Sequence, residues 1–314
     1  MKQSIRIISP SGAINPDFID GASQRLRAWG FEVSESAHAR GGFGRFSGTD
    51  EERLADLTEA LSDSSVDFIL CSRGGYGLQR IIDQIVHHTP TIIGFSDITA
   101  LHQLCALTPY TVHHTPYTVH HTPYTVHHTP YTIHGLMCKH IATLPEDSEA
   151  LQLFRQALSG KPLHYDLPPH PLNRFGEAEG TLIGGNLSVL YGLQGTPYSL
   201  NAVLDTHPEG CILFIEDICE RHYHIDRMMR NLRMSGVLSR IKGLVVGQFT
   251  DCDCDPLMGC SVYDTIYEAV AEYSYPVLFD FPAGHVDDNR PLYLNSPAQL
   301  QVAPTSTVAC SFLD

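Results

Sequence analysis

Short apolar runs alternate with helical patterns through the first 107 residues, and this alternation restricts the fold more than any other feature of the chain. The strand-like runs, rich in β-branched residues, cover 5–9, 31–34, 66–71 and 91–95. Helical patterns cover 17–29, 49–61 and 97–107, and a further helix is expected around Ile81, Ile82 and Ile85. Parallel strands need crossover connections, usually helices, so the alternation predicts a doubly wound, mostly parallel sheet of the flavodoxin or Rossmann type.

A Pro- and His-rich polar stretch follows this region, and mixed strand and helix patterns resume after it. At about 150 residues per domain, 314 residues suffice for two. We predict an N-terminal α/β domain at 1–160, a linker at 161–178 and a C-terminal domain at 179–314. The second domain is predicted to be mixed α/β with a β-barrel-like sheet, closed by late strands near 292–294, 300–302 and 308–312.

Charge and cysteine content restrict the function and the compartment. Lys and Arg total 20 against 35 Asp and Glu, a net charge of -15. This balance argues against nucleic acids and anionic membranes as partners. The N-terminus shows no signal-peptide pattern, and no apolar run approaches the roughly 20 residues of a membrane span. Nine scattered cysteines, several within apolar runs, favour free thiols in a reducing cytoplasm.

The pattern breaks at 108–128, which is three copies of the heptapeptide TPYTVHH. A proline every seven residues excludes a helix, and an odd period reverses the faces of a strand from copy to copy. We interpret the segment as a tandem duplication carried as an irregular or hairpin-like extension. The alternative is a metal-binding tract, because seven of the 18 histidines lie between His113 and His134.

Three chemically useful residues follow predicted strands. Ser96 stands between a strand and a helix, where its Oγ could project from the sheet, although a serine before Asp is also a common N-cap. Glu216 ends an apolar strand, and His285 follows another. The order Ser, Glu, His could supply a nucleophile, an orienting acid and a general base, but any large α/β protein offers such a trio by chance.

Two further clusters admit simpler interpretations. The glycine loop at 72–77 lacks the residues of a P-loop, so its glycines are better suited to bring backbone N–H groups close to a reacting carbonyl. Cys252, Cys254 and Cys260 could chelate a soft metal, but without a second cysteine pair or a nearby histidine pair an ordinary polar loop is favoured.

Five motifs in this order closely resemble the LD-carboxypeptidase family of serine peptidases, the muramoyl-tetrapeptide carboxypeptidases. They are RGGYG with Arg80, GFSDITAL at 94–101, GTLIGGNL at 180–187, IED at 215–217 with Glu220, Tyr223, Asp226 and Arg227, and Gly284-His285. The resemblance implies that Ser96 is the nucleophile, Glu216 the triad carboxylate and His285 the general base. The backbone N–H groups of Asp97 and Gly75 would form the oxyanion hole.

The resemblance further implies a cytoplasmic homodimer without metal or cofactor, which releases D-alanine from murein tetrapeptides in peptidoglycan recycling. An immunity-type peptidase of the same family, cleaving a peptidyl-nucleotide antibiotic of the microcin C kind, is one alternative. A non-catalytic ligand- or metal-binding protein built on the histidine tract is another. The chain departs from the family in the repeat and in Leu136, where the family's His-Gly-Pro-Met has proline.

Overall fold

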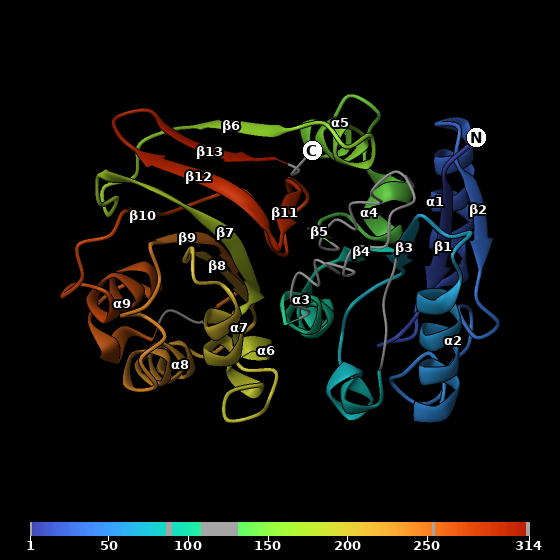
Figure 1. Ribbon diagram of the computed structural model, residues 1–314, viewed down its shortest axis with the longest axis horizontal. Helices are drawn as coiled ribbons and strands as arrows, with labels where there is room; N and C mark the ends of the chain where they lie inside the picture. The colour runs from blue at the N-terminus through green and yellow to red at the C-terminus, as the bar shows by residue number, and fades with distance from the viewer. Residues whose placement is uncertain (1, 86–89, 108–130, 253–254, 312–314) are drawn as a thin grey trace, which may run out of the picture.

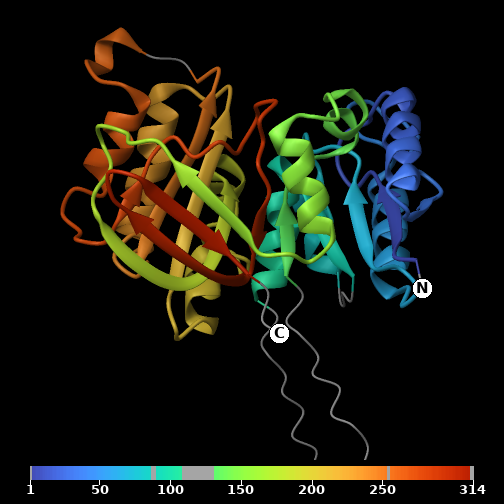
Figure 2. The same cartoon turned by 90° about the horizontal axis from the view of Figure 1, so that it is seen from above.

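The computed structural model describes residues 2–85, 90–107, 131–252 and 255–311, and all structural statements below refer to them. Two β-sheets lie side by side (Figures 1 and 2). The first sheet and its helices form the half of the molecule that contains the N-terminus, and the second sheet and its helices form the other half. The predicted α/β class is confirmed. The repeat at 108–128 lies outside the described residues.

The first sheet has the strand order β2-β1-β3-β4-β5-β11. Its strands are β2 (Glu32–Glu35), β1 (Ser4–Ile8), β3 (Phe68–Cys71), β4 (Thr91–Gly94), β5 (Thr132–His134) and β11 (Leu292–Leu294). The first five are parallel and follow the 2-1-3-4-5 order of flavodoxin-like sheets, as predicted.

Helices cover both faces of this sheet. One face carries α1 (Pro16–Ala28) and α4 (Cys138–Thr143), and the other carries α2 (Asp50–Ser62) and α3 (Thr99–Ala106). The helix α2 begins with the capping box that Thr49 and Glu52 form. Next to the first sheet, α5 (Glu149–Leu158) packs against β6 (Leu163–Leu167).

The helix expected around Ile81 is wrong, because the segment forms two short 3₁₀ turns. They are η1 (Leu78–Arg80) and η2 (Ile82–Gln84). Ile81 lies between them at φ -129°, outside the helical region, and the N–H groups of Ile81 and Ile85 each bond three residues back. Apolar spacing here reflects burial of the isoleucines and not an α-helix.

The second sheet is mixed and has the order β10-β9-β8-β7-β12-β13-β6. Its strands are β10 (Val277–Leu278), β9 (Gly243–Thr250), β8 (Cys211–Ile218), β7 (Gly176–Asn186), β12 (Ser296–Val302), β13 (Ser306–Cys310) and β6 (Leu163–Leu167). The strands β7 to β10 are parallel, and the other three are antiparallel to their neighbours. The sheet curls strongly in Figure 2, but among the described strands its two ends, β6 and β10, do not pair.

Four helices pack on one face of the second sheet. They are α6 (Leu187–Gly192), α7 (Leu200–Thr206), α8 (His222–Met234) and α9 (Val262–Ala269), with the short turn η4 (Pro256–Met258) before α9. A separate apolar cluster includes residues of both sheets, among them Ile133 and Phe214. The two sheets therefore share a continuous core.

Two segments differ from the sequence analysis. The strand β11 was expected to close the second domain, but it pairs with β5 of the first sheet. Within the expected linker at 161–178, Leu163, Tyr165 and Leu167 are buried while His164 and Asp166 are exposed, and this alternation forms β6. The high Pro and His content hid a strand signal, and the domain boundaries themselves stay a prediction.

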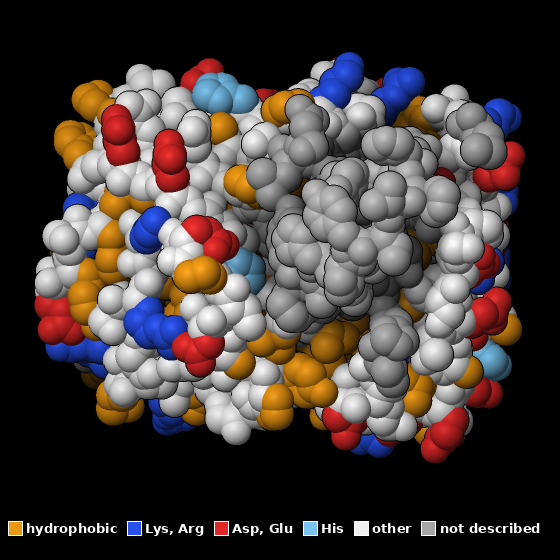
Figure 3. Space-filling model, viewed as in Figure 1, with side chains coloured by type: hydrophobic (Ala, Val, Ile, Leu, Met, Phe, Trp, Pro, Cys, Tyr) orange, Lys and Arg blue, Asp and Glu red, His pale blue; other side chains and the backbone are white. Residues whose placement is uncertain are grey.

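No helix of the described residues is long and apolar enough to cross a membrane. On the face drawn in Figure 3, described acidic and basic side chains are interspersed, without a continuous basic patch.

Candidate active site

Ser96 occupies a strained turn at the carboxyl end of β4. It begins the 3₁₀ turn η3 (Ser96–Ile98) with φ +66°, a left-handed conformation that is unusual for a residue other than glycine. A Cβ atom added at Gly74 would lie 2.9 Å from Ser96 Oγ, so only glycine there admits the serine. Ser96 itself is half-buried, and a strained, accessible serine on a strand-to-helix turn suits a nucleophile.

Asp97 is held by its side chain. Its Oδ2 accepts hydrogen bonds from Ser11 Oγ at 2.7 Å and from the Leu78 N–H at 3.0 Å. Burial raises the pKa of Asp97, and these two donors oppose that rise. The carboxylate thus ties the turn after Ser96 to the loop between β3 and η1, which contains Gly75.

Glu216 and His285 form a hydrogen-bonded pair. Glu216 lies near the carboxyl end of β8 and is fully buried, and its Oε2 is 2.8 Å from His285 Nδ1. The half-buried His285 ring packs edge-on against Phe95, with ring centroids 4.9 Å apart. Because Phe95 directly precedes Ser96, the pair lies beside the turn that carries the serine.

Gly284 and Asn289 fix the loop before His285, and the sequence analysis assigned neither of them a role. Gly284 has φ +136°, and a Cβ atom there would lie 3.1 Å from Glu216 Oε2. Its N–H donates to Oδ1 of the fully buried Asn289 at 2.9 Å. No sequence motif includes Asn289. Its partner is a backbone N–H group, so no second side chain forms a recognisable pattern with it.

Thr99 and Asn186 connect the two sheets close to these residues. The Asn186 N–H donates to Thr99 Oγ1 at 2.9 Å, and Asn186 lies opposite Glu216 in the register of β7 and β8. A Cβ atom at Gly185 would lie 2.4 Å from Thr99 Oγ1, so glycine is needed for this approach. The GTLIGGN motif therefore brings the start of α3 onto the end of β7.

Asp217, next to Glu216, has a different environment. Its carboxylate accepts from Asn186 Nδ2 at 2.9 Å and from the Ser188 N–H at 2.8 Å. Burial first, and then the neighbouring Glu216 carboxylate, raise the pKa of Asp217 to about 7. The two adjacent carboxylates of the IED motif thus divide their tasks, because Glu216 contacts His285 and Asp217 holds the start of α6.

Three other histidines near Phe95 are poor candidates for a general base. The rings of His134 and His140 pack on Phe95, at centroid distances of 5.6 and 5.8 Å. Burial lowers the pKa of His140 and of His102 to about 4 and lowers that of His134 well below its usual range. These buried rings favour the neutral form, and the His102 ring bonds to the Gly94 carbonyl oxygen at 2.9 Å, whereas His285 combines partial exposure with a carboxylate partner.

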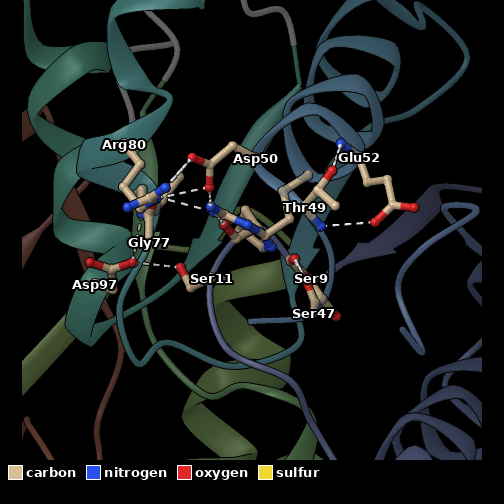
Figure 4. A network of polar contacts seen from close by, with 12 residues as sticks. Ser9, Ser11, Ser47, Thr49, Asp50, Glu52, Gly77, Arg80 and Asp97 are labelled. Carbon is tan, nitrogen blue, oxygen red and sulfur yellow. Dashed lines mark hydrogen bonds and ion pairs between the residues drawn. The ribbon is translucent and has the colours of Figure 1, made fainter. Parts of the chain in front are cut away.

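A buried arginine supports the glycine loop. Arg53, 1% exposed, donates to the carbonyl oxygens of Pro10 at 2.5 Å and Gly77 at 3.2 Å. Asp50 bridges Arg53 and Arg80, with ion-pair distances of 2.5 and 2.6 Å, and Figure 4 shows the side chains of Asp50 and Arg80 pointing toward one another. Through the bond to Gly77, this network contacts the loop two residues after Gly75.

Not every predicted contact is present. Among the described residues, no hydrogen bond joins Ser96 to His285, and such bonds often form only in the substrate complex. The roles of Asp97 and Gly75 as oxyanion-hole donors also stay predictions. The described residues contain no group of three or more His, Cys, Asp or Glu suited to a metal ion, and Cys254 and most of the histidine tract lie outside them.

Two family models match most of the chain. The LD-carboxypeptidase N-terminal domain matches residues 5–114, and the LD-carboxypeptidase C-terminal domain matches residues 179–300. The chain belongs to the LD-carboxypeptidase family. A Synechocystis protein named as a carboxypeptidase is 31% identical over 309 residues, covering 94% of this chain and 90% of the relative.

One solved structure supports this family assignment, and another shares the fold. The muramoyltetrapeptide carboxypeptidase of Oxalobacter formigenes has a TM-score of 0.80 at 26% identity, covering 98% of this chain and 99% of that one. MccF in complex with glutamyl sulfamoyl guanosine has a TM-score of 0.78 at 20% identity, covering 99% of this chain and 96% of that one. At that identity the second likeness concerns the fold alone.

Proposed function

We propose that this LD-carboxypeptidase homologue is a serine peptidase that releases the terminal D-alanine from murein tetrapeptides. The observation that carries the proposal is the hydrogen-bonded pair of buried Glu216 and half-buried His285, beside the strained turn at Ser96. Membership of the family and the likeness to a muramoyltetrapeptide carboxypeptidase support the substrate class.

The proposed reaction begins with attack of Ser96 Oγ on the carbonyl carbon before the terminal D-residue. Glu216 occupies Nδ1 of His285, so Nε2 is the nitrogen that takes the serine proton. The buried carboxylate fixes the ring and stabilises the imidazolium as it forms. His285 then gives this proton to the departing amine, which leaves as D-alanine.

Hydrolysis of the acyl-enzyme repeats the sequence with water as the nucleophile. His285 takes a proton from water and returns it to Ser96 Oγ. The negative oxygen of each tetrahedral intermediate would be held by the N–H groups of Asp97 and Gly75. Asp97 suits this role because its side chain fixes the backbone at that point.

The experiment is D-alanine release from a defined murein tetrapeptide, compared with a matched D,D-peptide. The Ser96→Ala protein should release no D-alanine, while its thermal unfolding stays close to that of the wild type, because only one hydroxyl is removed. Turnover by the Ser96→Ala protein would eliminate the proposed nucleophile.

Two further measurements test the alternatives. Hydrolysis of an aminoacyl-sulfamoyl adenylate, without any release from the tetrapeptide, would favour the immunity-type peptidase. Stoichiometric zinc or nickel in protein purified without metal-affinity resin would favour the metal-binding alternative. A cytoplasmic location and a homodimer belong to the proposal, to be checked by cell fractionation and by light scattering.

A further inference from the structure

A cavity of about 460 Å³ adjoins the glycine loop. Arg45, Arg73, Gly75 and Tyr76 line it, together with smaller residues. Gly75 follows Gly74, whose added Cβ would lie 2.9 Å from Ser96 Oγ. The volume is within the usual range for small-molecule sites, and Gly75 of the cavity wall directly follows the glycine that lies against the proposed nucleophile.

The cavity is locally basic in a strongly acidic protein. The chain carries a net charge of -15, yet the charged residues of the cavity wall are two arginines, without a carboxylate. Nearby arginines have partners, since Arg53 and Arg80 both pair with Asp50. Among the described residues, no hydrogen bond or ion pair holds the Arg45 guanidinium.

The backbone that carries Arg45 is nevertheless fixed. The Ala13 N–H donates to the Arg45 carbonyl oxygen at 3.2 Å, and Phe43 and Phe46 exchange backbone hydrogen bonds of 2.8 and 3.0 Å around the turn. Arg45 is therefore an exposed cation on a supported turn, available for a ligand.

Arg73 is fixed by its side chain instead. Its guanidinium donates to the Ala13 carbonyl oxygen at 2.9 Å, and a Cβ atom at Gly12 would lie 3.3 Å from Arg73 Nε. A guanidinium has five N–H donors, so this bond leaves several for a ligand. One anchored and one free arginine on the same cavity wall suit a planar anion with two oxygens.

We propose that this cavity is the subsite for a carboxylate of the peptide substrate, with Arg45 as its principal ligand and Arg73 as the second. The inference rests on the proposed function. A peptide that ends in D-alanine offers its terminal carboxylate, and a third residue with an acidic side chain would be a second source. Both present the same chemistry to the arginines.

The test compares wild-type, Arg45→Gln and Arg233→Gln proteins. Arg233 is the matched control, because it is a half-exposed arginine on α8, outside the cavity, paired with Glu272. Arg45→Gln should raise KM for the tetrapeptide about 10- to 100-fold with little change in kcat, as expected when a charged hydrogen bond to substrate is lost. Arg233→Gln should match the wild type. Arg73 is less informative, since its loss also removes the bond to Ala13.

Two amidated tetrapeptides identify which carboxylate is bound. One carries a C-terminal carboxamide, and the other has an amide in place of the side-chain carboxylate of its third residue. The peptide that lacks the bound group should be insensitive to Arg45→Gln. Equal sensitivity of all three peptides, or no effect of Arg45→Gln on any of them, would overturn the inference.

Calorimetric binding separates this inference from the proposed function. The tetrapeptide is titrated into Ser96→Ala protein with and without Arg45→Gln, so no turnover is needed. A Kd weakened about 10- to 100-fold by Arg45→Gln supports the subsite even if the wild type releases no D-alanine. An unchanged Kd refutes the subsite even if the wild type is active.

Discussion

One added methyl group at Gly284 would test the geometry of the Glu216–His285 pair. The Cβ atom of Gly284→Ala would lie 3.1 Å from Glu216 Oε2 and 3.2 Å from the Gln248 carbonyl oxygen, tighter than ordinary van der Waals contact. One side must move by a few tenths of an ångström. Glu216 is enclosed within the core, so the displacement falls on the loop that carries His285.

The expected magnitude follows from that displacement. A misplacement of 1 Å can cost about 100-fold in rate, so a few tenths predict a fall in kcat of about tenfold, or roughly 1.4 kcal/mol. Alanine at φ +136° also strains the backbone, by about 1–3 kcal/mol in the free energy of unfolding. Gly30→Ala is the control, since Gly30 has φ +103° and nothing within 4 Å of an added Cβ.

The assay is steady-state D-alanine release, with thermal unfolding of both variants. Both should lose stability through backbone strain, but only Gly284→Ala should lose kcat. If folded Gly284→Ala kept the wild-type kcat, or if Gly30→Ala lost as much, close packing of Gly284 on Glu216 would not position the pair.

Three further substitutions test the surrounding structure. Arg53→Met should lower the free energy of unfolding by about 1–3 kcal/mol, because it leaves the buried Pro10 carbonyl oxygen without its donor, whereas Asp50 keeps its ion pair with Arg80; an unchanged free energy in chemical denaturation would contradict this. Asn289→Ala leaves the buried Gly284 N–H without its acceptor and should cost about 1–3 kcal/mol together with part of kcat, whereas an unchanged kcat would argue against a positioning role. Because the folded pKa of Asp217 is raised to about 7, the folded state retains a proton that the unfolded chain loses at about pH 4, and the contribution of Asp217 to stability declines as pH rises between these values. Urea unfolding at pH 5 and pH 8 should show a smaller pH difference for Asp217→Asn than for the wild type, and equal differences would refute the shift.

The sequence predicted those parts of the fold that depend on local patterns. Continuous apolar runs identify buried parallel strands, and the alternation with helices gives the doubly wound order. The same logic placed Ser96, Glu216 and His285 after strands, and the structure has Glu216 and His285 in contact. Ser96 was assigned through the motif, because a serine before Asp has a commoner use as an N-cap.

Long-range contacts could not be predicted in the same way. Arg53 bonds to Pro10, 43 residues away. In the sequence it stands within a helical pattern, where an arginine is usually exposed, so nothing there indicates that it is buried. The strand β11 has three residues, too few for the alternation of apolar and polar residues to show which sheet it joins. Its partner β5 lies more than 150 residues earlier in the sequence. The short turns at Leu78–Arg80 and Ile82–Gln84 show a second limit. There the buried isoleucines have the spacing of an α-helix, although the backbone forms 3₁₀ turns.

The position of β11 links the two sheets close to the site. The loop carrying His285 leaves the second sheet at β10 and enters the first at β11, which pairs with β5, so each end of the loop is held by a different sheet. His134 of β5 lies opposite both Gly94 of β4 and Leu292 of β11. Because β4 runs directly into the turn at Ser96 and β11 follows the loop of His285, the pairing of β4 and β11 with the two sides of β5 holds the turn beside that loop.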